Sequence, residues 1–332
     1  MKALVVSGPG DIALLSVPDP VAGDGEVLVR PRRVGMCGTD LEIIDGSIDQ
    51  AYVTMPLILG HEWSGVVVES ATGMPAVGAR VVVEGIIPCG VCDECRTGNT
   101  NRCRIYDELG FTRAGAAADL IAVPASLVHV LDDTVSFESG VLVEPAAVVY
   151  RAIDRANPQA GARILVVGDG TVGLLAASIA RLWSPATVDV LGARTAQETL
   201  ALAAGADAFL SDPLLLSTTY DVVIEAAGTA AAADTALRSV SRGGTVVLLG
   251  LAGTGAMASL PIDDIVNGDV TVVGSFSYTR TAWSAVVEML NSDRLSLDFL
   301  VTHRFTLAEW ESAVATLRHS DGVRGKVLLE IG

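Results

Sequence analysis

Four of the five cysteines in this chain lie close together and have the spacing of metal ligands. Cys89, Cys92, Cys95 and Cys103 follow the pattern C-x2-C-x2-C-x7-C, so that one loop can surround a single ion. Four thiolates are a usual ligand set of structural zinc. Bacterial iron–sulfur motifs have three residues before the last cysteine and a proline after it, whereas seven residues precede Cys103 and Arg104 follows it. A structural zinc ion is therefore predicted.

Disulfide bonds are the competing interpretation of these cysteines. The first residues, MKALVVSGPG, lack the apolar run and the cleavage signal of a secretory peptide. Reduced thiols and a cytoplasmic location are therefore expected, because disulfides are rare in that compartment.

A second group of metal-binding residue types lies upstream. Cys37 occurs in GMCGTD, and His61 and Glu62 occur together in GHEWSG. Catalytic zinc sites keep one coordination position free, whereas structural sites are closed. A closed site and an open site together suggest a zinc enzyme.

A glycine-rich turn predicts a dinucleotide site. The apolar run RILVVG leads into G-x-G-x-x-G, and a helical stretch follows directly. In this setting the turn and the helix N-terminus bind a pyrophosphate. We assign the whole turn to cofactor binding, together with two residues that follow later strands: Gly168, Asp169, Gly170, Thr171, Val172, Gly173, Ala227 and Gly250.

The end of the next predicted strand, in ATVDVLGARTAQ, indicates which nicotinamide is bound. NAD sites usually have an acidic residue at this place, but this chain has Gly192, with Arg194 and Thr195 just beyond, and Asp189 lies inside the strand. A guanidinium suits a 2′-phosphate, so NADP(H) is favoured over NAD(H). The alternative is that Arg194 is only a solvated residue at a helix start.

Length and charge limit the class of protein. The chain has 332 residues, which is enough for about two domains. Its net charge of −17, from 22 basic and 39 acidic residues, argues against a nucleic-acid partner. The long uncharged stretch 243–262 contains five glycines and Pro261, so we predict strand, loop and strand there and no membrane span.

The hydrophobic pattern changes along the chain. Short valine-rich runs up to about residue 145 predict a β domain. From Ala162 onward, apolar runs alternate with alanine-rich stretches, which predicts strands and helices in a parallel sheet. Two amphipathic helices, SAVVEMLNSD and LAEWESAVATLRHS, follow Val273, and the last strand, GKVLLEIG, is expected to return to the first domain.

One more motif, LVEPAAV with Glu144, lies between the cysteine loop and the glycine turn. With it, the chain resembles the zinc-dependent medium-chain alcohol dehydrogenases over essentially its whole length, and in particular their polyol, threonine and glucose dehydrogenase branch. The resemblance implies an α/β plus β fold: a GroES-like catalytic domain at 1–146 and 277–332, with a structural-zinc lobe at 86–106, and an inserted Rossmann domain, a doubly wound parallel sheet, at 147–276. It also implies one catalytic and one structural zinc per chain.

The resemblance implies roles for the residues around the second metal group. Cys37 and His61 resemble the first two catalytic zinc ligands, and Glu62 and Glu144 resemble the carboxylates that complete or exchange in the coordination sphere. Which carboxylate binds zinc directly is left open. Asp40 resembles the residue that orients the His61 ring.

Two further residues of the same stretch have implied roles. Thr39 resembles the hydroxyl that passes the alcohol proton outward, although it also suits a helix cap. Glu42 resembles a carboxylate that binds sugar hydroxyls or ends the proton relay, although it also suits a solvated helix face.

The implied reaction is hydride transfer between a hydroxylated small molecule and NADP(H). The substrate class is a polyol, sugar, cyclitol or secondary alcohol, but sorbitol is in doubt because Ser277 stands where sorbitol dehydrogenases have arginine. Candidate pocket residues are Trp63, Tyr106, Phe111, Tyr278 and Arg280. Three histidines fit no motif and are interpreted as structural or exposed: His129, His303 and His319.

Two other functions stay open, and so does the assembly state. A zinc-free quinone or enoyl reductase would use the same nucleotide domain, and a sensor without catalysis would use the cysteine loop as a redox switch. Homodimers and homotetramers both occur in the family. The VVLLGLAG region is a candidate edge strand for such an assembly.

Overall fold

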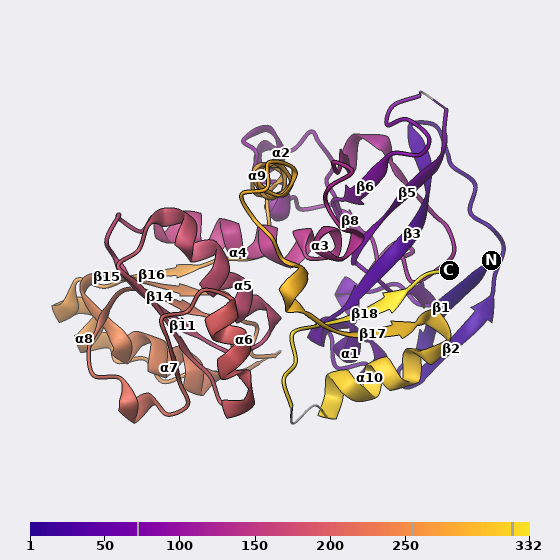
Figure 1. The fold of residues 1–332 in the computed structure, drawn as a ribbon. Coiled ribbons are helices and arrows are strands. Elements are labelled where there is room, and N and C mark those ends of the chain that lie inside the picture. Colours follow the sequence, from indigo (N-terminus) through magenta and orange to yellow (C-terminus); the bar gives the residue numbers. More distant parts are fainter. Residues whose placement is uncertain (72, 254, 320–321) are drawn as a thin grey trace. The chain divides into compact units, whose positions relative to one another are not determined.

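The computed structural model describes residues 1–71, 73–253, 255–319 and 322–332, and the chain forms two compact units (Figure 1). The first unit contains Met1–Glu144, Thr279–Ser320 and Lys326–Gly332, and the second contains Pro145–Tyr278 and Asp321–Gly325. The chain therefore leaves the first unit to build the second, returns to the first, and joins the second unit once more in the short segment Asp321–Gly325.

The first unit is built on a mostly antiparallel sheet with the strand order β10-β6-β5-β3-β18-β17, and β9 also pairs with β3. In chain order these strands are β3 (Glu26–Met36), β5 (Glu62–Ser70), β6 (Arg80–Val83), β9 (Ile121–Pro124), β10 (Val128–Val130), β17 (Val301–Thr306) and β18 (Lys326–Glu330). The C-terminal strand β18, yellow in Figure 1, pairs antiparallel with the early strand β3. The expected return of the C-terminus to the first domain is confirmed.

Smaller sheets and helices complete the first unit. The short strands are β1 (Lys2–Gly8), β2 (Asp11–Ser16), β4 (Leu57–Ile58), β7 (Ile86–Ile87) and β8 (Asp107–Glu108). The helices are α1 (Gly38–Asp45), α2 (Asp93–Arg96), α3 (Phe137–Val141), α9 (Arg280–Asn291) and α10 (Trp310–His319). Both predicted amphipathic helices form, as α9 and α10. In α9, the side chains of Trp283, Val286 and Leu290 recur at helical spacing and are buried.

The second unit is a parallel sheet with the order β13-β12-β11-β14-β15-β16 among the described residues. Its strands are β11 (Arg163–Val167), β12 (Thr187–Leu191), β13 (Ala208–Leu210), β14 (Tyr220–Glu225), β15 (Val240–Leu248) and β16 (Thr271–Gly274). All neighbours are parallel, and the order is that of a doubly wound dinucleotide-binding sheet. The predicted parallel sheet is confirmed.

Helices alternate with these strands because each apolar strand is followed by an alanine-rich stretch. They are α5 (Thr171–Ala180), α6 (Glu198–Ala203), α7 (Ala230–Ser239) and α8 (Ile262–Gly268), and α4 (Val143–Ala156) leads into the unit. In the central strand β11, Ile164, Leu165 and Val166 are all fully buried. A strand covered on both faces has such a continuous apolar run instead of an alternating one.

One predicted element is wrong. The stretch 243–262 begins inside β15, but the described residues between Leu248 and Ile262 form no second strand. Leu251 and Met257 are 78% and 88% exposed there, and β16 takes the next place in the sheet. Glycine disfavours strand structure, and this stretch contains several glycines.

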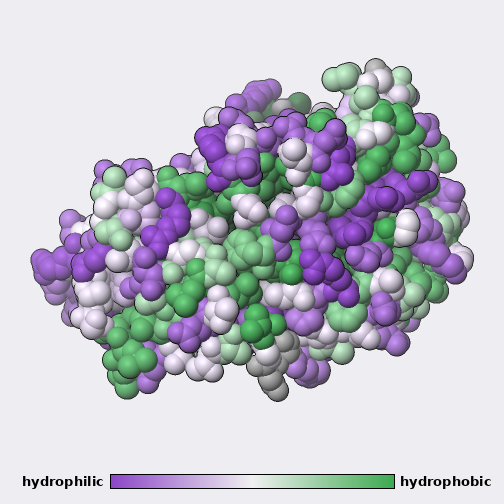
Figure 2. Space-filling model, in the orientation of Figure 1, coloured by the Kyte–Doolittle hydropathy of each residue, from purple (hydrophilic) through white to green (hydrophobic). Residues whose placement is uncertain are grey.

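The surfaces seen in Figure 2 are mosaics of hydrophilic and hydrophobic residues, as is usual for globular proteins. Among the described residues, no helix combines the length and the apolar character needed to cross a membrane.

Candidate metal and nucleotide sites

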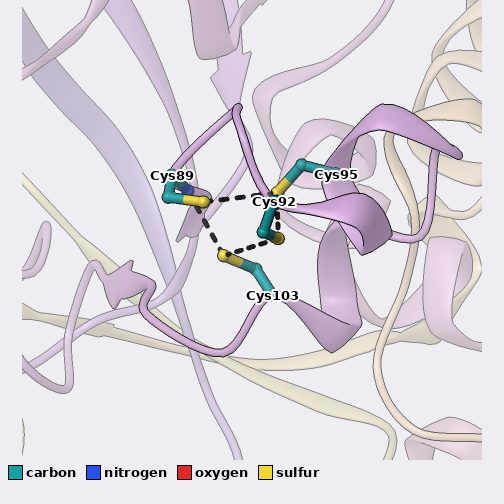
Figure 3. Close-up of side chains that lie close together, drawn as sticks. All are labelled: Cys89, Cys92, Cys95 and Cys103. Carbon is teal, nitrogen blue, oxygen red and sulfur yellow. Dashed lines mark hydrogen bonds between the residues drawn. The ribbon is translucent and has the colours of Figure 1, made fainter.

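The four clustered cysteines lie on the loop between β7 and β8, which includes α2. Their side chains point toward one another (Figure 3), and their sulfur atoms all lie within 4.8 Å of each other. The Cys92–Cys95, Cys89–Cys95 and Cys92–Cys103 sulfur pairs are 3.5, 3.9 and 3.9 Å apart. Sulfurs bound tetrahedrally to one zinc ion at about 2.3 Å would be about 3.8 Å apart. The loop therefore fits a closed zinc site.

The backbone of this loop also favours thiolates. The N–H groups of Val91 and Cys92 donate to the Cys89 sulfur and lower the pKa of Cys89 to about 6. Another N–H group, that of Cys89, donates to the Cys103 sulfur at 3.3 Å. Such donors stabilise the charged form, which is the form that binds zinc.

We expect Cys95→Ala to destabilise the protein by about 3 kcal/mol or more, because a structural metal site contributes folding free energy directly. Zinc content should fall by one ion per chain, and the denaturant midpoint should fall with it. Thr97→Ala is the matched control, since the Thr97 hydroxyl lies on the same loop, donates to the Asp93 and Glu94 carbonyls and accepts from Asn99 Nδ2. An unchanged zinc content and midpoint in Cys95→Ala would refute the structural role.

The second metal group is assembled by the pairing of two strands. Cys37 follows the end of β3, and Glu62 opens β5, which runs antiparallel to β3 with Gly35 opposite Glu62. The Cys37 sulfur consequently lies 3.2 Å from His61 Nε2. A Glu62 carboxylate oxygen completes a set of ligand atoms that all lie within 4.8 Å of one another. A thiolate, an imidazole and a carboxylate are a donor set that suits zinc with a position left open.

Asp40 lies in the first turn of α1 and faces the His61 ring. Its Oδ2 atom accepts from the Cys37 N–H at 2.8 Å, and its Oδ1 atom lies 3.6 Å from His61 Nδ1. Burial raises the pKa of Asp40. Burial lowers the pKa of His61, but the negative charges of Cys37 and Asp40 outweigh it and hold that pKa well above its usual value. Nδ1 thus faces Asp40 while Nε2 faces the Cys37 sulfur.

Thr39 and Glu42 lie on the same helix and are partly buried. In the part of the chain that the structure describes, no hydrogen bond joins either side chain to the Cys37–His61–Glu62 group. The Glu42 carbonyl accepts the N–H groups of Ser47 and Ile48 where the helix ends. The structure therefore brings Asp40 to the ring, whereas no hydrogen bond joins Thr39 or Glu42 to it among the described residues.

Glu62 has a partner that the sequence analysis missed. Lys326, the first residue of β18, is 1% exposed, and its ammonium group forms a buried ion pair with the Glu62 carboxylate. The same Nζ atom donates to the Met36 carbonyl at 3.3 Å. A Cβ atom at Gly35 would lie 2.4 Å from Glu62 Oε2, so the glycine leaves room for this carboxylate.

Two more carboxylates lie near the metal group. Burial and the charge of Glu62 raise the pKa of Glu144 to about 8. Burial raises the pKa of Glu108 to about 7, against the positive charge of His61, which lowers it. Glu144 was predicted as a possible ligand, but it does not join the compact group of ligand atoms among the described residues. Glu108, at the end of β8, was missed by the sequence analysis.

The candidate pocket residues have different surroundings. Phe111 packs against His61 with the ring centres 5.0 Å apart, whereas Trp63 is 2% exposed in the core of the first unit. Arg280 Nε donates to buried Glu84 at 2.9 Å, and Glu84 also pairs with His129 Nε2 at 2.9 Å. The interpretation of His129 as structural agrees with this network, and Arg280 belongs to the same network.

The glycine turn between β11 and α5 has the shape of a phosphate site. Gly168 has φ of +130°, and a Cβ atom at Gly173 would lie 2.0 Å from the Gly168 carbonyl oxygen, so both positions require glycine. A Cβ atom at Gly170 would meet nothing within 4 Å. Gly170 is the N-cap of α5, and its open side leaves space for a pyrophosphate at the helix N-terminus.

The end of β12 is occupied by an ion pair. The Asp169 carboxylate accepts from Arg194 Nη2 at 2.7 Å, Nε at 3.1 Å and the backbone N–H at 2.8 Å. Arg194 is thus fixed by the glycine turn, and the alternative that it is simply solvated is wrong. A Cβ atom at Gly192 would lie 2.5 Å from Asp169 Cβ, which explains the glycine by packing. Asp189 accepts from the Tyr220 hydroxyl at 2.8 Å.

The other predicted cofactor residues lie at the same edge of the sheet. The Ala227 N–H donates to the Glu225 carboxylate at 2.9 Å, so this donor is already used. A Cβ atom at Gly250 would lie 2.3 Å from the Gly228 nitrogen, so two turns pack closely there. Thr195, beyond Arg194, is exposed.

Two family models match the chain in order. The model of the alcohol dehydrogenase GroES-like domain matches residues 23–133, and that of the glucose dehydrogenase C-terminus matches residues 137–327.

Individual relatives cover nearly the whole chain. Sorbitol dehydrogenase of Gallus gallus is 31% identical over 97% of this chain and 94% of its own length. L-threonine 3-dehydrogenase of Streptomyces coelicolor is 33% identical over 99% of both chains. A zinc-binding dehydrogenase of Sinorhizobium meliloti, solved bound to NADP, is 29% identical and superposes with a TM-score of 0.91 over 99% of this chain and 98% of that one.

Proposed function

Because this chain belongs to the zinc-dependent medium-chain alcohol dehydrogenases, in their polyol and threonine dehydrogenase branch, we propose that it oxidises a secondary hydroxyl of a polyol, sugar or cyclitol with NADP⁺. In the reverse direction it would reduce the corresponding carbonyl with NADPH. The chain is an oxidoreductase of the alcohol and polyol dehydrogenase type, and its cofactors are zinc and a nicotinamide nucleotide.

The observation that carries this proposal is the convergence of Cys37, His61 and Glu62 on one point. When bound there, zinc supplies Lewis-acid polarisation of the substrate hydroxyl, and the nicotinamide accepts the hydride. We assign to Asp40 the orientation of the His61 ring, since Asp40 Oδ1 lies 3.6 Å from Nδ1 while Nε2 faces the Cys37 sulfur. We assign to Thr39 the transfer of the hydroxyl proton outward, because a hydroxyl can accept and donate together.

Glu108 and Glu144 support the choice of a polyhydroxylated substrate. Both carboxylates lie close enough to His61 for the positive charge of His61 to lower their pKa. Carboxylates accept hydrogen bonds from hydroxyl groups, and a simple apolar alcohol has no second hydroxyl to offer them. We therefore assign the hydroxyl beside the reacting one to Glu108, with Glu144 completing the metal surroundings.

Turnover by the zinc-loaded protein tests the proposal. Initial rates would be measured with NADP⁺ and with NAD⁺ on aldoses, polyols, cyclitols and simple secondary alcohols of matched length. We expect the hydroxylated substrates and NADP⁺ to be preferred. Glu108→Gln should raise KM for a polyol about tenfold, since one charged hydrogen bond is weakened, and leave a simple secondary alcohol unaffected. Equal effects on both would refute the assignment of Glu108.

The assembly state is part of the proposal. The VVLLGLAG region does not supply a free edge, because β15 is paired on both sides, with β14 and β16. Beyond β15, the edge of the sheet is β16, where Val272 is 40% exposed. Ile262 and Val266 of α8 are 59% and 72% exposed. An exposed strand edge beside apolar side chains is a usual place for pairing with another chain, so we propose a homo-oligomer joined there.

Val272→Lys is expected to separate this oligomer, because a lysine on the edge opposes the pairing of strands. Sedimentation velocity should show a smaller particle than the wild type at equal concentration. Val130→Lys is the control, since Val130 is a 50% exposed strand valine of the other unit. A wild-type particle size in Val272→Lys, or a monomeric wild type, would contradict the proposed interface.

A further inference from the structure

We propose that Arg324 is a second arginine for the 2′-phosphate of NADP(H), acting together with Arg194. This inference rests on the proposed NADP(H) preference and adds to it a residue that lies far from the glycine turn in the sequence. No local motif surrounds Arg324, and its place follows from three contacts in the second unit.

Gln197 fixes the backbone of Arg324 beside the glycine turn. The side chain of Gln197 has no exposed surface. Its Nε2 atom donates to the Asp169 carbonyl at 2.7 Å and to the Arg324 carbonyl at 2.8 Å, and its Oε1 atom accepts from the Arg324 N–H at 2.8 Å. The hydroxyl of Thr171, the first residue of α5, donates to the Gly325 carbonyl at 3.1 Å. Residues 324–325 are therefore held against the glycine turn and the first turn of α5.

Two arginines and one aspartate lie close together at this place. Asp169 is the carboxylate that pairs with Arg194. Burial and the positive charge of Arg194 lower the pKa of Arg324, while the charge of Asp169 raises it, so all three groups lie within electrostatic range. Arg194 Nη1 is buried without a hydrogen-bond partner among the described residues.

A phosphate group is the ligand that these features fit. It carries about 1.5 to 2 negative charges at pH 7 and accepts hydrogen bonds from several directions. In a doubly wound sheet, the adenosine ribose lies at the end of the second strand, which is β12 here. An acidic residue that would hold a free 2′-hydroxyl has no space at Gly192, because Asp169 fills it. The ribose end of the site therefore has arginines where NAD sites have a carboxylate.

Binding of nucleotide fragments tests this inference without turnover. Isothermal titration of the whole protein would compare 2′,5′-ADP with 5′-AMP, which differ by the 2′-phosphate. We expect Arg324→Ala to weaken 2′,5′-ADP about 10- to 100-fold, the range of a charged hydrogen bond, and to change 5′-AMP less than about twofold. The hydrogen bonds between Gln197 and Arg324 involve the Arg324 backbone, so the fixed segment should persist in Arg324→Ala. Arg242→Ala, an exposed arginine of the same unit, is the control.

The outcomes separate the two proposals. A wild type that binds both fragments equally would refute the NADP(H) preference, and the role of Arg324 with it. The wild type could instead prefer 2′,5′-ADP while Arg324→Ala loses no more affinity for this fragment than Arg242→Ala does. That result would overturn the role of Arg324 alone. If Arg324→Ala also weakens the binding of 5′-AMP, Arg324→Gln is measured in its place. It must then weaken the binding of 2′,5′-ADP and leave that of 5′-AMP unchanged, or the role of Arg324 is refuted.

Discussion

Cys37→Ala is expected to lose almost all turnover while the protein still folds. The Cys37 sulfur lies 3.2 Å from His61 Nε2, and its removal takes away one of the donors that converge there. A Lewis acid contributes several kcal/mol to the transition state, and about 1.4 kcal/mol is a tenfold change in rate. We therefore expect kcat/KM to fall about 1,000-fold or more.

The measurement combines steady-state kinetics with zinc content and thermal unfolding. Cys37→Ala should hold one zinc ion fewer per chain and melt close to the wild type, since Cys37 is only partly buried and leaves little space unfilled. Cys95→Ala is the counterpart, because it should lose stability first. If Cys37→Ala kept wild-type kcat/KM at the reduced zinc content, the catalytic role of this cysteine would be disproved.

The second unit was predicted well because its signals are local. The run RILVVG before the glycine turn becomes β11, whose central residues are fully buried, and the stretch after the turn becomes α5. A strand and a helix next to each other in sequence need no distant partner to be recognised. The prediction of a second strand after Leu248 failed, because composition alone does not say whether the sheet has room for another strand there. The position beside β15 is taken by β16.

The cysteine loop was also predictable, since its four ligands lie within one short segment. The residues missed near the metal group are of another kind. Glu108 is one of several acidic residues, and nothing in YDELG distinguishes it from a solvated turn. Its position depends on β8 pairing with β7 beside the metal group, which is a property of the tertiary structure.

Lys326 did leave a signal in the composition. The chain has only two lysines, Lys2 and Lys326, among 22 basic residues. A compact ammonium group fits a narrow buried space better than a planar guanidinium does. Its partner, however, could not be named from the sequence, because Glu62 and Lys326 meet only when β5 and β18 pair with opposite sides of β3.

We expect Lys326→Met to be among the most destabilising single substitutions in the first unit. It would leave the Glu62 carboxylate buried without its cation, and breaking a buried ion pair in this way costs about 3 to 5 kcal/mol. Urea denaturation of the zinc-depleted protein would measure this loss. Lys2→Met is the matched control, because Lys2 is exposed and its ammonium group only donates to the Ser16 hydroxyl. It should change the free energy of unfolding by less than about 0.5 kcal/mol.

Glu62→Gln combined with Lys326→Met should recover much of this loss, because no unpaired charge then stays buried. Repeating the urea denaturation of the single and double variants with zinc bound distinguishes the two candidate carboxylate ligands, Glu62 and Glu144. Glu62 belongs to the compact ligand group and Glu144 does not, so we expect zinc to compensate Glu62 and to reduce the cost of Lys326→Met. An equal cost with and without zinc would show that Glu62 does not contact the metal, and the direct ligand would then be Glu144.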